Sequence, residues 1–152
     1  MIDIYEWRAR MKLTTKARYG LRALVDLAVH ADGDVVALSQ VADRQEISMS
    51  YLEQLVARLR KADIVIGVRG AQGGYKLARP AEEISVGDVL RALEGDLHPV
   101  DCIELEGINE CDNSDTCVTK YVWMRISDSI NGVIDNMMLS ELVDESKDKL
   151  LK

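Results

Sequence analysis

The three cysteines of this 152-residue chain fall within one stretch of 16 residues, at Cys102, Cys111 and Cys117. They lie in residues 96–117, which carry many carboxylates and no helical periodicity, as a polar loop does. Soft thiolates on such a loop suit an iron–sulfur cluster, zinc or copper(I). We therefore expect a metal or cluster site on these cysteines, with three ordinary free thiols as the alternative.

The number and setting of the cysteines also indicate a cellular compartment. Three is an odd number, and the first ten residues lack the apolar core of a signal peptide. No apolar run approaches the length of about 18 residues that a membrane-spanning helix needs. The sequence therefore predicts a cytoplasmic protein without a disulfide framework and without a membrane partner.

A second set of residues has the chemistry to read DNA. Ser48, Ser50 and Gln54 bring small hydroxyls and an amide to the start of a predicted helix. The N–H groups and serines there can bind phosphate, and the amide can face a base edge. Cationic side chains that could reach the DNA lie around them, at Lys16, Arg18, Arg58 and Arg69. The alternative is that the serines only cap a helix and the nearby glycines only form a hairpin.

The distribution of charge supports the DNA interpretation. The net charge of −7 would by itself discourage a nucleic-acid partner. However, residues 8–79 hold 13 Lys or Arg against 7 Asp or Glu, whereas residues 80–152 hold 6 against 17. The basic part can meet phosphate while the acidic part keeps the molecule soluble.

The hydrophobic pattern predicts the elements that position these residues. Helical spacing predicts three helices, over residues 15–31, from residue 38, and over 48–61. A β-prone run at 64–69, a glycine-rich turn and a second run at 75–77 predict a hairpin. Three helices followed by a hairpin is the order of a winged helix-turn-helix, so the predicted class is mainly α with a small β-hairpin.

The second half of the chain is predicted to carry a long dimerisation helix. Ser85 and Asp88 have the spacing of a capping box that opens another helix. An apolar stripe then runs along residues 119–136, and a lone helix of this length cannot bury it, so we expect a partner helix. The chain divides into an N-terminal extension at 1–10, a DNA-binding domain at 11–80, and a region at 81–152 that holds the cluster loop (96–117) and the dimerisation helix.

Several separated motifs, in a fixed order, resemble the IscR-like repressors of the Rrf2 superfamily. They lie at residues 11–20, 47–55, 58–61, 69–75 and 85–89. The resemblance covers roughly residues 11 to 143. It implies a homodimeric transcription regulator of repressor type, in which each winged helix reads half of a palindromic operator on double-stranded DNA.

The resemblance also implies roles for individual residues. Those matching the major-groove positions are Ser48, Ser50, Tyr51 and Gln54. Those matching the wing are Arg69, Gly70, Gly73 and Gly74. Glu53 matches a position that tunes the class of operator bound, and a carboxylate can favour cytosine amino groups while phosphates repel it. We therefore expect Glu53 to govern specificity rather than affinity.

For the cysteines, the resemblance implies an iron–sulfur cluster, with 2Fe–2S favoured, held by the three thiolates. The spacing between the first two cysteines is longer than in the IscR type. Where that type supplies a histidine as fourth ligand, this sequence has Lys120, a poor ligand while protonated. Our candidate for the fourth ligand is His98; a loop carboxylate, solvent, a small thiol, Asp3 or Glu6 are the alternatives.

The expected function is thus a regulator, not an enzyme, whose operator binding is controlled by the cluster. The first alternative is a thiol-sensing, zinc-sensing or cysteine-metabolism repressor of the same family without a cluster. A different class, an iron–sulfur carrier or enzyme subunit, would need a second ligand set or a paired acid–base motif, and the sequence has neither. Residues 70–74 lack the Lys-Ser or Lys-Thr continuation of a phosphate-binding loop.

Overall fold

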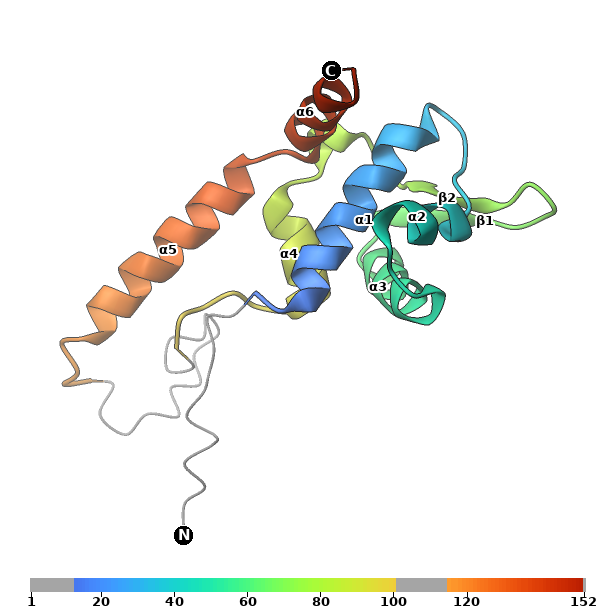
Figure 1. Cartoon of the computed structure of the whole chain (residues 1–152). Helices are drawn as coiled ribbons and strands as arrows, with labels where there is room; N and C mark the ends of the chain where they lie inside the picture. The colour runs from blue at the N-terminus through green and yellow to red at the C-terminus, as the bar shows by residue number, and fades with distance from the viewer. Residues whose placement is uncertain (1–12, 101–114, 152) are drawn as a thin grey trace, which may run out of the picture.

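The computed structural model describes residues 13–100 and 115–151. Within these ranges the chain forms six α-helices, a short 3₁₀ turn and one antiparallel hairpin (Figure 1). The elements are α1 (Thr15–Ala31), α2 (Leu38–Gln45), α3 (Met49–Lys61), β1 (Val65–Val68), β2 (Gly74–Leu77), η1 (Ala81–Glu83), α4 (Val86–Glu94), α5 (Lys120–Asn136) and α6 (Leu139–Leu150). None of the helices in the described ranges combines the length and apolar character needed to cross a membrane.

The first three helices and α4 share one apolar core. Leu24 of α1, Leu52 and Leu55 of α3, and Leu93 of α4 are each 1% exposed or less. Burying a leucine contributes about 1.5–3 kcal/mol, so this cluster is the main attachment of α3 to the rest of the molecule. The predicted order of helices is confirmed.

The predicted hairpin forms the wing. Strands β1 and β2 pair antiparallel, from Val65 opposite Leu77 to Val68 opposite Gly74. The segment between α1 and α2 adds one further bridge, because the Val36 N–H donates to Tyr75 O at 2.9 Å and the Tyr75 N–H donates to Val36 O at 2.8 Å. A Cβ at Gly74 would collide with the Val36 carbonyl, so glycine is required for this approach. The bridge ties β2, at a position near the turn of the hairpin, to the segment between α1 and α2.

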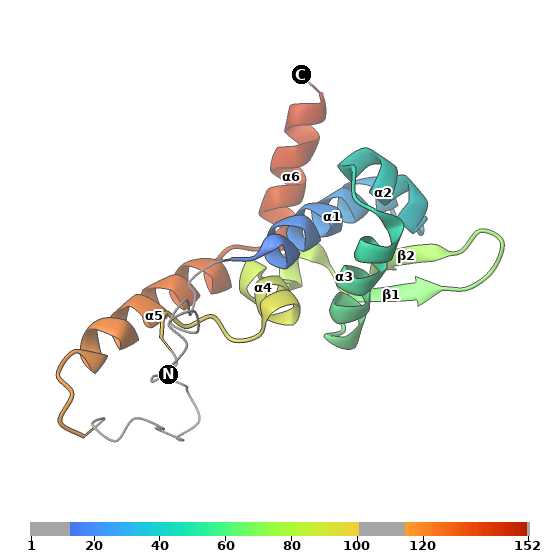
Figure 2. The ribbon, with the colours of Figure 1, turned by 60° about the horizontal axis from the view of Figure 1, so that its bottom comes forward.

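Helix α4 lies between α1 and α5 (Figure 1 and Figure 2). Its predicted capping box is confirmed: the Asp88 N–H donates to Ser85 Oγ at 3.0 Å, and the Ser85 N–H donates to the Asp88 carboxylate at 3.4 Å. The box satisfies two backbone donors at the start of the helix. Helix α4 also packs on α1 and α5, and α6 packs on α1, so both helices join the two halves of the chain.

The long helix predicted at 119–136 is confirmed as α5, which begins at Lys120. It projects away from α3 and the wing (Figure 2), and its apolar side chains Tyr121, Val122 and Val133 are 60%, 50% and 61% exposed. The hydrophobic pattern of the sequence does not predict α6, which begins shortly after the end of α5. Leu139 and Val143 of α6 are 0% and 7% exposed, so this helix belongs to the common core.

Candidate nucleic-acid interface and sensor segment

The predicted recognition helix, α3, begins at an N-cap serine. Ser48 has an extended backbone, and its side chain accepts a hydrogen bond from the Tyr51 N–H at 3.4 Å. This satisfies one of the donors that a helix leaves free at its start. Because the leucine face of α3 is buried in the core, the opposite face and the N-terminal turn lie at the surface.

The outward face of α3 carries most of the residues predicted to contact DNA. The exposed ones are Ser48, Ser50, Glu53, Gln54 and Arg58. Gln54, Arg58 and Lys61 line one shallow groove, so the structure brings an amide and two cations together on one surface. An amide can bond two atoms of a base edge, and cations neutralise phosphates.

Tyr51 joins α3 to the first turn of α1. Its hydroxyl donates to Thr15 Oγ1 at 3.2 Å, and its ring meets the Tyr19 ring edge-on, with centroids 6.3 Å apart. Lys16 and Arg18 are exposed on the same turn of α1. The predicted contact residues of α1 and α3 therefore lie on adjoining helix ends, and Tyr51 is partly buried between them.

The wing residues lie at the turn of the hairpin, which projects from the body (Figure 1). Arg69 is exposed. Gly70 has φ 125°, a conformation that other residues rarely adopt, and a Cβ at Gly73 would collide with the Val68 carbonyl oxygen. These glycines shape the turn that presents Arg69, so their role is geometric.

The start of α1 is capped by a residue that sequence analysis does not single out. Glu94, the last residue of α4, accepts hydrogen bonds from the backbone N–H groups of Thr14 and Ala17, each at 3.1 Å, and from the Thr14 hydroxyl. A carboxylate at a helix N-terminus also interacts favourably with the helix dipole. Glu94 is 80 residues from Thr14, so no local pattern could reveal this cap.

Of the three cysteines, Cys117 is described, whereas Cys102 and Cys111 lie outside the described residues. The Cys117 thiol is partly exposed and lies 3.1 Å from the Thr119 hydroxyl. That hydrogen bond, followed by one at the Lys120 backbone, holds the pKa of Cys117 below its ordinary value. A thiolate is the form that binds metals, so Cys117 suits the predicted role.

The described part of the chain contains two of the four predicted ligands, Cys117 and His98. No three His, Cys, Asp or Glu side chains come together there in a way that could hold a metal ion, and two predicted ligands lie outside it. His98, the candidate fourth ligand, is partly buried in the segment that follows α4. Lys120 opens α5, with its Nζ 5.6 Å from the Tyr121 ring centroid.

The segment leading from α4 to the cysteines is anchored on α5. Asn131 donates from Nδ2 to the Leu97 carbonyl at 3.3 Å, and its Oδ1 accepts from Arg91 Nη1 at 3.0 Å. Arg91 also forms an ion pair with Asp135. The backbone next to His98 is therefore bonded to α5 through Asn131, and Arg91 of α4 fixes the Asn131 side chain.

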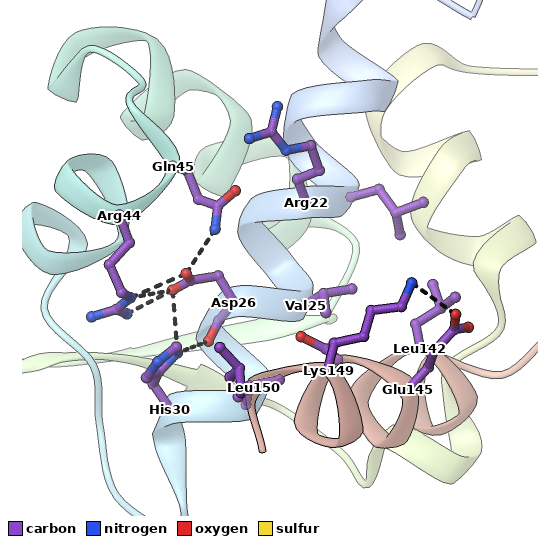
Figure 3. A pocket seen from close by; sticks show the side chains of 13 residues that line it. Arg22, Val25, Asp26, His30, Arg44, Gln45, Leu142, Glu145, Lys149 and Leu150 are labelled. Atoms are coloured by element: carbon purple, nitrogen blue, oxygen red, sulfur yellow. Dashed lines mark hydrogen bonds and ion pairs between the residues drawn. The ribbon is translucent and has the colours of Figure 1, made fainter. Parts of the chain in front are cut away.

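A second unpredicted cluster connects α1 with α2 on the floor of a pocket (Figure 3). The buried carboxylate of Asp26 accepts hydrogen bonds from Arg44 and Gln45, and His30 lies beside it. The hydrogen bond to Asp26 raises the pKa of the Arg44 guanidinium above its ordinary value. The sequence carries one sign of this cluster, because Asp26 is a charged residue on the otherwise apolar face of α1, but it does not indicate the partners of Asp26.

Comparison with known proteins gives a consistent set of relatives. Residues 13–145 match the Rrf2 family, described as iron-dependent transcriptional regulators. The HTH-type transcriptional regulator IscR of Serratia proteamaculans is 42% identical over 134 residues, which cover 88% of this chain and 80% of the relative.

Solved structures agree with this relationship. IscR of T. potens has a TM-score of 0.72 and 43% identity, over 90% of this chain and 88% of its own. CymR, described as the global cysteine regulator of B. subtilis, has a TM-score of 0.72 and 35% identity, over 90% of this chain and 98% of its own. These neighbours confirm the predicted fold class, and the relatives are transcriptional regulators rather than enzymes.

Proposed function

This chain belongs to the Rrf2 family of transcriptional regulators, and from that premise we propose that it is a homodimeric repressor whose operator binding is controlled by an iron–sulfur cluster. The proposal keeps residues 11–80 as the DNA-binding domain and residues 81–152 as the region for sensing and dimerisation. Residues 1–10 form the N-terminal extension, to which the proposed function assigns no role. The predicted partner is a palindromic operator in double-stranded DNA.

The setting of Cys117 carries the cluster assignment. Its thiol is partly exposed, has a lowered pKa and stands directly before α5. Cys102 and Cys111 would supply the other two thiolates, and His98 the fourth ligand. A bound cluster, with 2Fe–2S favoured, would supply a redox-active centre at this point.

The exposed face of α3 supports the assignment of the DNA contacts. Gln54 would bond a base edge, with Ser48, Ser50 and Tyr51 beside it at the major groove. Lys16, Arg18, Arg58 and Arg69 would meet the DNA backbone, with Arg69 carried by the wing glycines Gly70, Gly73 and Gly74. Glu53 would select between operators, because a carboxylate can accept a hydrogen bond from a cytosine amino group but is repelled by phosphates.

The surface of α5 supports the dimer. Its stripe includes Val122, Ile126 and Val133, which are 50%, 36% and 61% exposed. Each apolar side chain of this size gains about 1.5–3 kcal/mol on full burial. A second copy of the same helix would cover this stripe, because one self-complementary patch is what a two-fold dimer requires.

Two described contacts offer a route from the cysteine segment to the DNA-binding surface. Asn131 bonds Leu97 at the base of the segment and is itself bonded by Arg91 of α4, and Glu94 of the same helix bonds the first turn of α1. That turn contacts Tyr51 of α3. A change in the segment can therefore reach the recognition helix through α4, as a shift between two populations with different contacts.

The cluster assignment is tested by metal analysis of protein purified without oxygen. We expect iron and acid-labile sulfide in equal amounts, about two of each per chain for a 2Fe–2S cluster, together with visible absorption. Cys117→Ser should lose both, whereas the control Asp128→Asn, an exposed change on α5 outside the loop, should retain them. Protein with neither sulfide nor visible absorption would contradict the assignment.

The fourth ligand is tested separately with His98→Ala. Replacing a ligand changes the electronic environment of the iron, so we expect a shifted visible spectrum or a less stable cluster. An unchanged spectrum would remove His98 from the ligand set and leave the three thiolates.

A second candidate function is a thiol-sensing, zinc-sensing or cysteine-metabolism repressor without a cluster. Two observations favour it: the likeness to CymR, and Lys120 at the position where the IscR type has a histidine. It predicts no sulfide in the anaerobic protein. Stoichiometric zinc or three titratable free thiols would then identify which form is present.

A further inference from the structure

The strongest polar cluster outside the DNA surface and the cysteine segment surrounds Asp26. The Asp26 side chain is 4% exposed. Arg44 donates to both carboxylate oxygens, from Nη2 at 2.6 Å and from Nε at 3.0 and 3.1 Å, and Gln45 donates from Nε2 at 2.8 Å. His30 donates from Nδ1 to the Asp26 carbonyl at 2.8 Å (Figure 3).

Stability alone does not account for a carboxylate at this position. Asp26 stands in the interior of α1, near the buried Ala23, Leu24 and Leu27, and far from the helix N-terminus where a negative charge is favourable. Removing a carboxylate from water costs several kcal/mol, which the ion pair must offset. Replacing such a pair with apolar residues is often neutral or even stabilising. A buried ion pair of this kind is therefore weak evidence for a stabilising role, whereas the directional bonds of Asp26 point to a geometric one.

The partners of Asp26 lie where α2 turns into α3. Arg44 and Gln45 are the last two residues of α2, and Ser48, three residues after Gln45, is the N-cap of α3. Three residues span at most about 11 Å. Fixing the end of α2 on α1 therefore fixes the point from which the recognition helix starts.

Apart from these hydrogen bonds, helix α2 is held mainly by apolar contacts with α1 and α3. It has only eight residues, of which Val41 and Ala42 are buried, and its N-cap, Ala37, provides no side-chain hydrogen bond. Apolar contacts such as these resist separation, but they constrain rotation and sliding only loosely. The four directional bonds to one rigid carboxylate supply the missing constraint.

We propose that Asp26 is a positioning residue for DNA reading, which sets the angle of α3 by clamping Arg44 and Gln45 at the end of α2. The inference rests on the proposed DNA-reading function of α3. It assigns Asp26 to specificity: base contacts through Gln54 depend on the angle of the helix, whereas phosphate contacts by flexible cationic side chains tolerate a small rotation.

The test compares Asp26→Asn and Asp26→Leu with the parent protein. Asp26→Asn keeps the shape but loses the charge and one acceptor oxygen, and Asp26→Leu removes the clamp but fills the space. The control is Glu145→Gln, which removes a carboxylate from the same pocket without touching α2, since Glu145 pairs with Lys149 on α6. Two DNA probes are used: a duplex selected by the parent from a randomised pool, and a scrambled duplex of the same composition.

We expect both Asp26 variants to lose about tenfold or more in affinity for the selected duplex, with affinity for the scrambled duplex kept within about twofold. Urea unfolding identifies conditions in which every variant is fully folded, so that loss of folded protein cannot imitate this result. Equal affinity of parent and variants for the selected duplex, or a parallel loss on both duplexes, would overturn the inference.

Hydrogen exchange of the free protein provides a second readout that does not depend on DNA. In both Asp26 variants, the amides of α2 and the first turn of α3 should exchange faster, while those of the α3 core turns should not. Unchanged exchange in α2 would overturn the positioning role of Asp26, whatever the DNA titrations show. A parent protein that binds the selected and scrambled duplexes equally would instead count against the proposed DNA-reading function of α3.

Discussion

At the residue scale, α3 separates the side chains that hold it from those that face outward. Leu52 and Leu55 are buried in the core, whereas Gln54 and Arg58 are exposed on the opposite face. The chemistry of the exposed pair differs. An amide distinguishes one base edge from another, whereas a guanidinium far along the helix attracts any phosphate.

The difference between these two side chains predicts two kinds of DNA-binding defect. Gln54→Ala should weaken binding to the selected operator by about 1–3 kcal/mol and leave binding to scrambled DNA almost unchanged. Arg58→Ala, its matched control, should weaken both and reduce the slope of log affinity against log salt by about one. Titrations of both duplexes at several salt concentrations measure this. A uniform loss in Gln54→Ala would show that Gln54 reads no base.

The lowered pKa of Cys117 gives a prediction for the metal-free protein. Because the Thr119 hydrogen bond stabilises the thiolate and lowers the pKa of Cys117, alkylation of this thiol should follow a titration whose midpoint lies below that of an ordinary cysteine. The measurement uses a variant in which Cys102 and Cys111 are serine. Thr119→Val should raise the midpoint, and Thr119→Ser should not. A midpoint unaffected by Thr119→Val would contradict the assigned cause.

The success of prediction from sequence also differs by residue. Ser48 and the Ser85–Asp88 capping box could be predicted, because each cap depends on residues within three or four positions. Glu94 and Asp26 could not, because Glu94 caps a helix start 80 residues away and Asp26 is bonded by residues 18 and 19 positions away. These are tertiary contacts, and a single sequence does not reveal which distant residues are the partners.

At the element scale, the helices with a continuous apolar stripe were predictable and α6 was not. The residues of α5 repeat at helical spacing along the whole helix, so the pattern alone indicates it. Helix α6 has few apolar residues among many charges, and it depends on packing against α1 and on Glu141, which accepts from the Met138 N–H at 3.0 Å. Its helical state is thus set by tertiary context rather than by propensity.

The exposed stripe of α5 predicts the effect of a charge placed on it. Val122→Glu should dissociate the proposed dimer, raising its dissociation constant at least about tenfold, because the interface would bury an unpaired carboxylate. Asp128→Asn, an exposed change on α5 away from the stripe, should leave the dimer intact. Sedimentation equilibrium distinguishes the two. A Val122→Glu protein that remains as dimeric as the parent would place the interface elsewhere.

At the scale of the whole molecule, the fold explains how a protein with a net charge of −7 can bind DNA. The basic residues belong to the part that includes α1, α3 and the wing, and the acidic residues to the part that includes α5 and α6. Helix α4 connects these two parts through Arg91 and Glu94, and α6 also packs directly on α1. The sequence predicts both parts, but only the structure reveals the connection between them.

The central claim is that the state of the cysteine segment controls DNA binding. It is tested most directly by measuring the affinity of one anaerobic preparation for its selected operator, first with its cluster and then after the cluster has been removed. The account predicts that the affinity, or the preferred operator sequence, changes by about tenfold or more, while Cys117→Ser behaves like the cluster-free protein. Equal affinity and equal sequence preference in both states would contradict it.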